Sequence, residues 1–545
     1  MRSFKKLASF FIACAMLAGC GSGATASAGS AAASETTDTS SITIAIDADL
    51  NTMDHHIATD GTSFNMQTMC LAGLAEKDEN GQAQPDLAES WDISDDGLVY
   101  TFHLRDGIKW SNGDPVTAND FVFAWRRLAD PATASEYNFI LSSIHVLNAD
   151  EVIAGEKDLS ELGVAAPDDS TFVVTLSLPC SFMLSLMGFP SFFPLQQKFF
   201  EAEGDQYAQS IDDMLYCGPY TMTDWQTGNQ YTFTKNPDYW NADHIYTDTV
   251  TFKFLQDTQT ALLEFESGNI DFVKIASEQV DSYKDTEGFF NYLQGFSWRM
   301  DFNFENAALQ NKDLREAISK ALDRKAIAEN VLKDGSVPAE GFIPVKFAYG
   351  PDGVDFRETA GDLIVEDVSE AQAAYEKAKA ALGGDAVVTL LYEDSESCKA
   401  VAENIQQQLE TNLPGLTVNM DLEPKKTRLQ LMKDHDYEIG LTRWGPDYED
   451  PQTFMDLFKS DTPGYTGTYS NPEYDGLLDK AETGEDAADP AARWADMIAA
   501  EKVLLDDYAC VPVYQNGGAM MINPKVSGYI FKITDTNYRH LKKEA

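Results

Sequence analysis

The feature that most limits the possible folds of this chain is a regular alternation of strand-like and helix-like segments between residues 387 and 442. Strand patterns occur at residues 387–392, 416–422 and 437–442. Between them, apolar side chains recur at helical spacing, first at Cys398, Val401, Ile405 and Leu409 and then over residues 429–432. Strand, helix, strand, helix and strand in so short a stretch indicate crossover connections between the strands of one sheet.

The rest of the chain mixes strands and helices without an internal repeat. Further alternating, strand-like segments are residues 42–46, 100–104, 172–176, 231–234 and 249–254. Thr117 and Asp120 have the spacing of a capping box at the start of a helix, and Asp313 opens another helix. We therefore predict a mixed α/β fold of the α+β kind, with the chain crossing between lobes near residues 296–303.

The N-terminus has the pattern of an export signal. Arg2, Lys5 and Lys6 precede an apolar run over residues 7–18, which is too short to span a bilayer as a mature helix. The run ends in Leu17-Ala18-Gly19-Cys20, which looks like a bacterial lipobox. An ordinary secretory signal with two incidental cysteines is the alternative interpretation.

On the lipobox interpretation, residues 1–19 are a signal peptide and Cys20 carries the lipid that anchors the protein outside the bacterial cell membrane. Residues 20–41 are then a flexible linker, because they are nearly all Gly, Ser, Ala and Thr and cannot form a core. The large remainder works outside the cell while tied to the membrane.

Charge and cysteine usage exclude several classes of partner. The formal net charge is −48, so nucleic acid and anionic lipid are repelled, and we expect neither as a ligand. Five cysteines remain beyond Cys20 and none forms a CxxC pair, which argues against a zinc site. We expect them to be buried thiols, although one pair such as Cys180 and Cys217 is open to oxidation outside the cell.

Two neighbouring histidines, His55 and His56, suggest a metal site at first sight. Adjacent side chains on a strand or loop point apart, and no cluster of acids and histidines surrounds them in the sequence. The acidic residues also lack the spacing of a calcium-binding loop. We therefore expect neither a metal nor any other cofactor.

The residues that follow the third strand of the alternating region form the candidate site. In open α/β sheets ligands bind beyond the strand ends. Residues 443–451 directly follow a predicted strand, so they are in a suitable position to contact a ligand. Gly445 and Pro446 force a tight turn, Trp444 and Tyr448 offer aromatic faces, and Asp447 offers a carboxylate between them. A carboxylate beside aromatic rings in a closed cleft is a receptor for an ammonium group.

The alternative is that Trp444 only packs and that the acids lie in a solvated turn. We accept this alternative for Glu449 and Asp450, because Asp450-Pro451 has the pattern of a helix N-cap followed by proline. For Asp447 we favour a role in binding.

Several motifs in the chain resemble those of the peptide- and oligopeptide-binding lipoproteins of ABC importers, which are extracellular solute-binding proteins of family 5. The longest is LRDGIKWSNGDPVTANDFVFAW at residues 104–125. Shorter ones are CGPY at 217–220, KNPDYW at 235–240, LREAI at 314–318 with Asp323-Arg324, and DPATASEY at 130–137. In the first motif, Trp110, Phe121 and Trp125 are most simply core residues.

The resemblance implies a two-lobed, periplasmic-binding-protein-like fold with a hinge. Lobe I would comprise residues 42–298, with an inserted subdomain at about 84–170, lobe II residues 299–511, and residues 512–545 would return to lobe I. The chain would capture oligopeptides and deliver them to the membrane permease and ATPase subunits of an importer, as a monomer and without catalysis.

The resemblance also assigns roles to individual residues. Asp447 would bind the peptide α-amino group beside Trp444, and the segment around Thr59 and Asp60 would pair with the peptide backbone. Tyr137 and Tyr514 would line pockets. The basic residue that oligopeptide binders carry for the peptide carboxylate is not matched at Leu441, and Arg443 lies two residues later.

Two alternatives remain open at this point. The same fold can serve another ligand, such as a dipeptide, a nickel chelate, an oligosaccharide or a signalling peptide. A secreted hydrolase is the other alternative, but the chain has no GxSxG or HExxH motif and its histidines form no recognisable triad.

Overall fold

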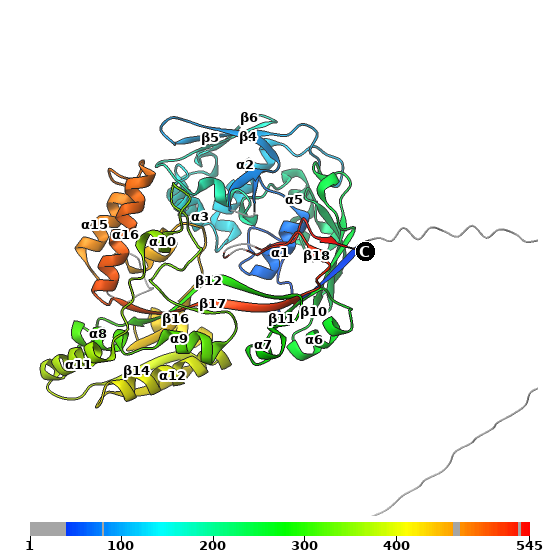
Figure 1. The fold of residues 1–545 in the computed structure, drawn as a ribbon. Helices are drawn as coiled ribbons and strands as arrows, with labels where there is room; N and C mark the ends of the chain where they lie inside the picture. Colours follow the sequence, from blue (N-terminus) through cyan, green and yellow to red (C-terminus); the bar gives the residue numbers. More distant parts are fainter. Residues whose placement is uncertain (1–39, 79–80, 461–468, 532, 534–535, 545) are drawn as a thin grey trace, which may run out of the picture. The chain divides into compact units, whose positions relative to one another are not determined.

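One large mixed sheet of eleven strands organises the protein (Figure 1). The computed structural model describes residues 40–78, 81–460, 469–531, 533 and 536–544. In spatial order the sheet contains β15 (Thr417–Glu423), β14 (Val387–Glu393), β16 (Ile439–Trp444), β12 (Phe289–Phe302), β17 (Cys510–Ile522), β11 (Phe272–Ile275), β1 (Ser41–Ile46), β10 (Thr249–Phe254), β9 (Gln230–Lys235) and β8 (Tyr220–Gln226), while the short β13 (Val337–Pro338) pairs with β17.

The alternating region forms the parallel end of this sheet, as predicted. β14 pairs in parallel with both β15 and β16, and the connecting helices are α12 (Glu396–Asn412) and α13 (Lys425–Lys433). β16 begins and ends two residues later than predicted, because Arg443 and Trp444 still pair with Trp298 and Ser297 of β12. Both residues are therefore held by the sheet, and the turn begins only at Gly445.

The two longest strands, β12 and β17, join the two ends of the sheet. The first part of β12 pairs with the end of β17, close to β11 and β1, and its second part pairs with the start of β17, next to β16. The pairing shifts between Leu293 and Ser297. The predicted lobe boundaries at 298/299 and 511/512 fall inside these strands, and the assignment of whole lobes to the segments stays a prediction.

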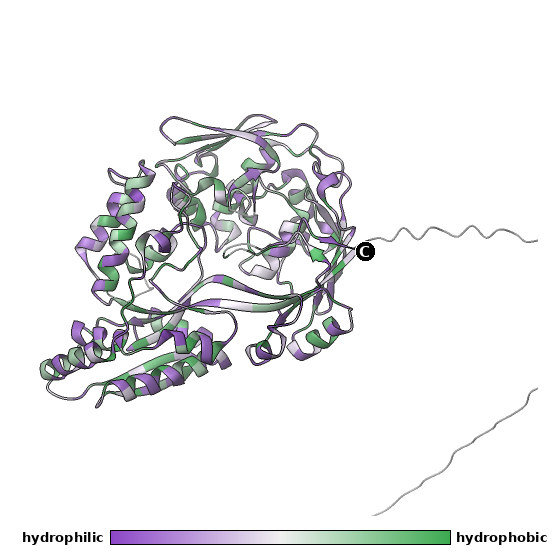
Figure 2. Cartoon of the chain, viewed as in Figure 1, coloured by the Kyte–Doolittle hydropathy of each residue, from purple (hydrophilic) through white to green (hydrophobic). Residues whose placement is uncertain are grey.

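The apolar core consists of separate clusters in different parts of the fold. One cluster surrounds β1, β10, α1 (Gly61–Cys70) and α2 (Ala118–Ala129), and it includes the predicted core residues Trp110, Phe121 and Trp125. A second lies between the parallel strands and helices α8 (Lys312–Lys320), α11 (Val368–Leu382) and α12. A third is built on α14 (Gln452–Met455), α15 (Pro472–Glu482) and α16 (Pro490–Asp506). Figure 2 shows hydrophilic and hydrophobic residues alternating along α11 and α12, as expected of helices that cover a sheet.

A separate sheet of four strands covers α2. Its order is β4 (Ala88–Ile93), β5 (Val99–Leu104), β7 (Thr171–Thr175) and β6 (Val164–Asp168). The predicted capping box begins α2, with the Asp120 carboxylate accepting a 2.8 Å hydrogen bond from the Thr117 amide. The predicted subdomain at about 84–170 overlaps this sheet, but its boundaries stay a prediction.

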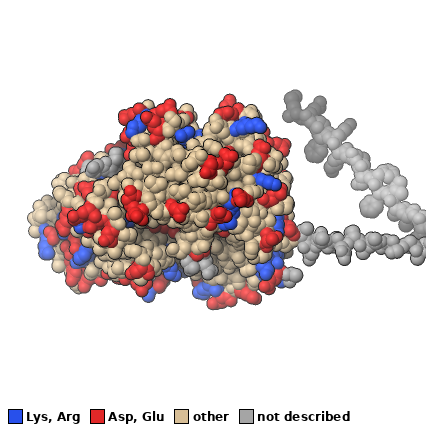
Figure 3. Space-filling view, turned by 90° about the horizontal axis from the view of Figure 1, so that it is seen from above, with Lys and Arg blue, Asp and Glu red and all other residues tan. Residues whose placement is uncertain are grey.

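The surface is acidic and the described cysteines are buried, as expected from the sequence. Acidic side chains are spread over the face seen in Figure 3, with fewer basic ones between them. The five described cysteines, Cys70, Cys180, Cys217, Cys398 and Cys510, are all buried and free. None of the helices in the described part of the chain is sufficiently long and apolar to cross a bilayer. Cys20 and the predicted signal and linker, up to Thr39, lie outside the described residues.

The prediction that His55 and His56 point apart is wrong. Their ring centroids lie 4.2 Å apart, and both side chains are fully buried. His56 Nδ1 lies 2.8 Å from a guanidinium nitrogen of Arg127, which also forms an ion pair with Asp54. Burial lowers the pKa of His55 to about 4, so that ring is neutral at physiological pH. Among the described residues no cluster of His, Cys, Asp and Glu is suited to hold a metal ion.

Candidate functional site

Two hydrogen bonds to one threonine hold the turn after β16 in place. Thr453 Oγ1 accepts hydrogen bonds from the Trp444 indole nitrogen at 3.4 Å and from the Asp447 amide at 3.3 Å. Thr453 belongs to the short helix α14, so the helix and the end of the strand fix the turn from both sides. The Asp447 backbone is therefore positioned by the fold before any ligand arrives.

The same turn lies tightly against β12. A Cβ atom at Gly445 would come within 2.4 Å of the Phe296 ring, and a Cβ atom at Gly295 would come within 2.5 Å of Pro446 Cδ. A side chain at either position would therefore displace its neighbour, which favours glycine at both. The site is thus attached to the strand that connects the two ends of the sheet.

The Asp447 carboxylate is half-buried and lacks a counter-ion among the described residues. No described residue forms an ion pair or a side-chain hydrogen bond with it. Burial raises the pKa of Asp447 to about 6. A partly desolvated, unpaired carboxylate is ready to receive a cationic group.

Tyr137 lies close enough to Asp447 and to Asp60 for both carboxylates to act on its hydroxyl group. Burial raises the pKa of Tyr137 to about 12, and the negative charges of Asp447, Glu136 and Asp60 add to the shift. The Tyr137 ring packs against Phe64 at 5.4 Å between ring centroids. The structure therefore brings three of the predicted site residues into one region.

The segment before α1 contains Asp60 and one further predicted contact, Thr59. Asp60 is the N-cap of α1, and its carboxylate accepts hydrogen bonds from the Ser63 amide at 2.9 Å and the Ser63 hydroxyl at 2.8 Å. The Asp60 carboxylate thus stabilises the start of the helix. Any contact of this segment with a ligand would therefore be made by its backbone. Thr59, just before it, is exposed.

The prediction of a solvated turn at Glu449 and Asp450 is wrong. Asp450 is buried and forms a two-pronged ion pair with Arg493 of α16, at 2.7 and 2.9 Å. It also accepts a hydrogen bond from the Gln452 amide, but the N-cap of α14 is Pro451 and not Asp450. Glu449 is half-buried and pairs with Lys77 at 3.1 Å.

These contacts join residues that are far apart in the chain. Lys77 ends strand β2 (Ala75–Lys77), and Tyr448 stacks on Phe182 with ring centroids 4.4 Å apart and planes inclined by 3°. Arg493 also donates to Ser181 Oγ at 3.3 Å. The turn that carries Asp447 is thus held between elements of the N-terminal and C-terminal halves of the chain.

Arg443 and Tyr514 lie against Trp298 in β12. The Arg443 guanidinium carbon is 5.1 Å from the Trp298 ring centroid and 4.9 Å from that of Phe296. Tyr514 is stacked on Trp298 at 5.6 Å and is only 1% exposed, so its ring does not face an open cavity in this structure. Leu441 is buried in the core and offers no contact to a carboxylate.

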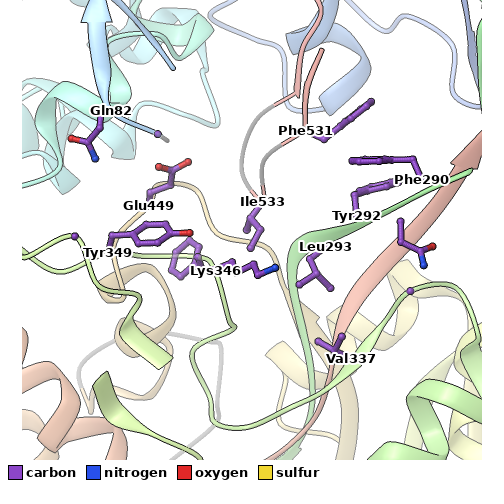
Figure 4. Close-up of a pocket in the computed structure, with 15 residues that line it drawn as sticks. Gln82, Phe290, Tyr292, Leu293, Val337, Lys346, Tyr349, Glu449, Phe531 and Ile533 are labelled. Carbon is purple, nitrogen blue, oxygen red and sulfur yellow. The ribbon is translucent and has the colours of Figure 1, made fainter. Parts of the chain in front are cut away.

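A cavity of about 700 Å³ opens beside the turn (Figure 4). Its lining consists of Gly81, Gln82, Phe290, Asn291, Tyr292, Leu293, Gly335, Val337, Lys346, Phe347, Tyr349, Gly353, Glu449, Phe531 and Ile533. None of the site residues predicted from sequence belongs to it. Its volume lies in the range of about 300–1,000 Å³ that is typical of small-ligand sites.

Sequence reasoning missed the residues that support the site. Arg493, Thr453, Phe182 and Lys77 reach it from separate elements, and no local pattern marks them. The proline after Asp450 signalled a helix start, but the burial of Asp450 depends on an arginine 43 residues later.

Solved structures show which class of protein this fold defines. The crystal structure of the substrate-binding domain of an oligopeptide ABC transporter from Bacillus anthracis str. Ames is similar, with a TM-score of 0.76 and 36% identity, covering 93% of this chain and 99% of that one. OppA of Listeria monocytogenes bound to peptide is similar with a TM-score of 0.75 and 34% identity, over 93% and 100% of the two chains. The fold is the two-lobed α/β fold of extracytoplasmic peptide-binding proteins.

The chain belongs to the bacterial extracellular solute-binding proteins of family 5, whose model (family 5 Middle) matches residues 82–466. Among curated relatives, a dipeptide-binding protein of Lactococcus lactis subsp. cremoris is 32% identical over 510 residues, covering 91% of this chain and 92% of the relative. The match therefore extends over nearly the whole length of both proteins.

Proposed function

We propose that this protein captures oligopeptides outside the cell membrane and delivers them to the permease and ATPase subunits of an ABC importer. The observation that carries the proposal is the half-buried Asp447 carboxylate, which has no counter-ion among the described residues. It fits the α-amino group of a peptide, because an ammonium group would neutralise it and the nearby aromatic rings would exclude water.

The peptide backbone would lie between two segments. One is the exposed stretch around Thr59, ahead of α1, and the other is the turn from Gly445 to Asp447. Extended peptides can bind through main-chain hydrogen bonds, with water filling the space around their side chains. Tyr137 would line the end of the site near the peptide amine, while Trp444, Arg443 and Tyr514 would support it through β12 and β16.

The lobes would close on the peptide about β12 and β17. These two strands connect the parallel end of the sheet to the end that contains β1 and β10. Hinge residues of such proteins lie in a few connecting segments that absorb the rotation. Closure would bring Phe182 onto Tyr448 and Lys77 onto Glu449, the contacts present in this structure.

The predicted lipid on Cys20 would keep the protein near its permease. Cys20→Ser removes the acceptor thiol, and we expect this variant to appear in the medium or the soluble extracytoplasmic fraction, while the wild type stays with the membrane. Cys14→Ser is the matched control and should leave the protein at the membrane. Retention of the Cys20→Ser variant would contradict a lipid anchor at this position.

A ligand screen tests the proposed function. A ligand that binds the folded protein at about 100 times its Kd raises the free energy of unfolding by about 2.7 kcal/mol, which is measurable as a rise in Tm. We expect oligopeptides to give this rise, and dipeptides, a nickel chelate and oligosaccharides to give less. A rise with a non-peptide class alone would reassign the ligand, and cleavage of a peptide seen by mass spectrometry would contradict a pure binding role.

A further inference from the structure

The residue directly after Asp447 packs in a different part of the protein from its chain neighbours. Tyr448 is 5% exposed and belongs to the apolar cluster around β1, β10, α1 and α2. Among the described residues, it is the one buried member of that cluster from residues 299–511. Phe454 and Met455, shortly after it in the chain, pack in the third cluster instead. Tyr448 therefore projects from predicted lobe II into the core of predicted lobe I.

An aromatic side chain of lobe I receives the Tyr448 ring. Phe182 is 6% exposed, and the two rings are nearly parallel, with centroids 4.4 Å apart and planes inclined by 3°. Stacked rings attract each other only over a narrow range of distances and orientations, and burial removes both faces from water. The pair therefore favours one arrangement of the two segments over others.

Two polar contacts flank the stacked rings. Lys77 Nζ lies 3.1 Å from Glu449 Oε1, and both side chains are largely shielded from solvent. Arg493 Nη1 donates to Ser181 Oγ at 3.3 Å and to Asp450 Oδ2 at 2.7 Å. Three consecutive residues, 448–450, thus connect to the N-terminal half of the chain, directly or through Arg493.

The stacked rings are separate from the surface that a ligand can touch. Neither Phe182 nor Tyr448 lines the cavity beside the turn, and their burial leaves almost no surface for a ligand. Asp447 and Tyr448 are nonetheless adjacent in the chain. The turn that offers a carboxylate to the ligand also joins the two predicted lobes.

We propose that Phe182 and Tyr448, with the Lys77–Glu449 and Arg493–Ser181 contacts, form a clasp that holds the two predicted lobes together and sets the rate of peptide release. The inference rests on the proposed function and adds how a captured peptide is retained. The clasp residues are positioning residues, because they act through the arrangement of the lobes. A peptide leaves when the lobes part, so weakening the clasp speeds release of different peptides alike.

Local support of Asp447 by Tyr448 is the competing explanation. The two explanations differ for Phe182, which lies 265 residues before Asp447 in the chain. If the stack only supports Asp447, loss of the Phe182 ring changes the preference for a free amine. If it is a clasp, this loss speeds release and leaves that preference unchanged.

Release rates test the clasp. Stopped-flow tryptophan fluorescence measures association and release of trialanine and of trileucine. We expect Phe182→Leu and Tyr448→Leu each to raise the release rate about tenfold for both peptides, with little change in association. The double variant should release no faster than the faster single variant, because the two rings share one contact. Tyr448→Phe, which keeps the stack, should restore slow release.

Two further variants control for damage to the fold. Phe233→Leu removes a ring that is fully buried in β9 against Phe252, within lobe I, and it should release both peptides as wild type does. Lys77→Met alters a partly exposed side chain and should raise the release rate by about threefold. It tests the clasp even if the Phe182 variant fails to fold.

Four results are decisive. Wild-type release rates in folded Phe182→Leu or in Lys77→Met would overturn the clasp and leave the proposed function intact. A changed affinity ratio between trialanine and N-acetyltrialanine in Phe182→Leu would also overturn it, in favour of local support of Asp447. Failure of wild type to bind any peptide would refute the proposed function. Small-angle scattering of the peptide-free proteins would then decide the clasp, which predicts a larger radius of gyration for Phe182→Leu, and equal radii would overturn it.

Discussion

A single carboxylate dominates the chemistry at the scale of the residue. Asp447 lies on a turn pinned by Thr453, it lacks a counter-ion among the described residues, and burial raises its pKa to about 6. The free protein therefore holds a charge in an unfavourable place at neutral pH. A ligand with an ammonium group would neutralise that charge and so gain binding free energy.

We expect Asp447→Asn to stabilise the ligand-free protein while it weakens peptide binding. The native pKa of about 6 exceeds the ordinary value of 3.8, so the charged carboxylate destabilises the folded state above pH 6. Removing the charge should raise the free energy of unfolding at pH 7 by up to about 3 kcal/mol. The gain should shrink as the pH falls from 6 to 4, because the wild-type carboxyl then becomes protonated in the native state. Denaturant titrations at pH 7 and pH 4 measure the two values, and a loss of stability at pH 7 would contradict this account.

Peptide affinity should also depend on pH with a defined sign. Binding needs the ionised carboxylate, and below a pKa of about 6 the free protein must release a proton to bind. Affinity should therefore fall by up to about tenfold per pH unit below 6 and stay level between 6 and 7.5. Calorimetry across this range is the measurement, and Asp447→Asn is the control that should show no such slope. A flat profile in wild type would show that Asp447 does not exchange a proton on binding.

At the scale of the element, the site depends on how three segments hold the turn. The turn follows the last residue of β16. Thr453 of α14 accepts hydrogen bonds from it, and Arg493 of α16 forms an ion pair with its Asp450. Asp450 is buried, so its charge is tolerated only because Arg493 is present.

We expect Arg493→Met to loosen this turn and to destabilise the protein. The substitution leaves the Asp450 carboxylate buried without its partner, which should lower the free energy of unfolding by about 3–5 kcal/mol. Peptide affinity should fall as well, because the turn loses its support. The double variant Asp450→Asn with Arg493→Met is the matched control and should recover much of the stability, since it removes both charges. If the single and double variants unfold alike, the ion pair does not hold the turn.

The sequence predicted the elements better than the contacts between them. The parallel strands and helices of residues 387–442 were predictable because each carries its own hydrophobic period. The place of Asp447 just beyond a strand was predictable in the same way, while its role in binding stays a prediction. The ion pair of Asp450 with Arg493 and the stacking of Phe182 on Tyr448 were not, because neither partner carries a local signal. The burial of His55 and His56 was missed for the same reason: their surroundings come from Arg127 and other distant residues.

At the scale of the whole molecule, β12 and β17 connect two ends of one sheet, and the candidate site lies against β12 at the register shift between Leu293 and Ser297. A ligand bound there contacts elements from both halves of the chain. If the lobes close on the ligand as proposed, a bound peptide stabilises the closed arrangement by its differential affinity for it.

The most direct test of the central claim is calorimetry with one oligopeptide in two forms, with a free α-amino group and with an N-acetylated one. If Asp447 receives the ammonium group, acetylation should weaken binding to wild type by about 2–5 kcal/mol, and Asp447→Asn should bind both forms with similar, weak affinity. Asp434→Asn, on an acidic residue at the end of α13, is the control and should behave as wild type. Equal affinities of wild type for the two peptides would contradict the account.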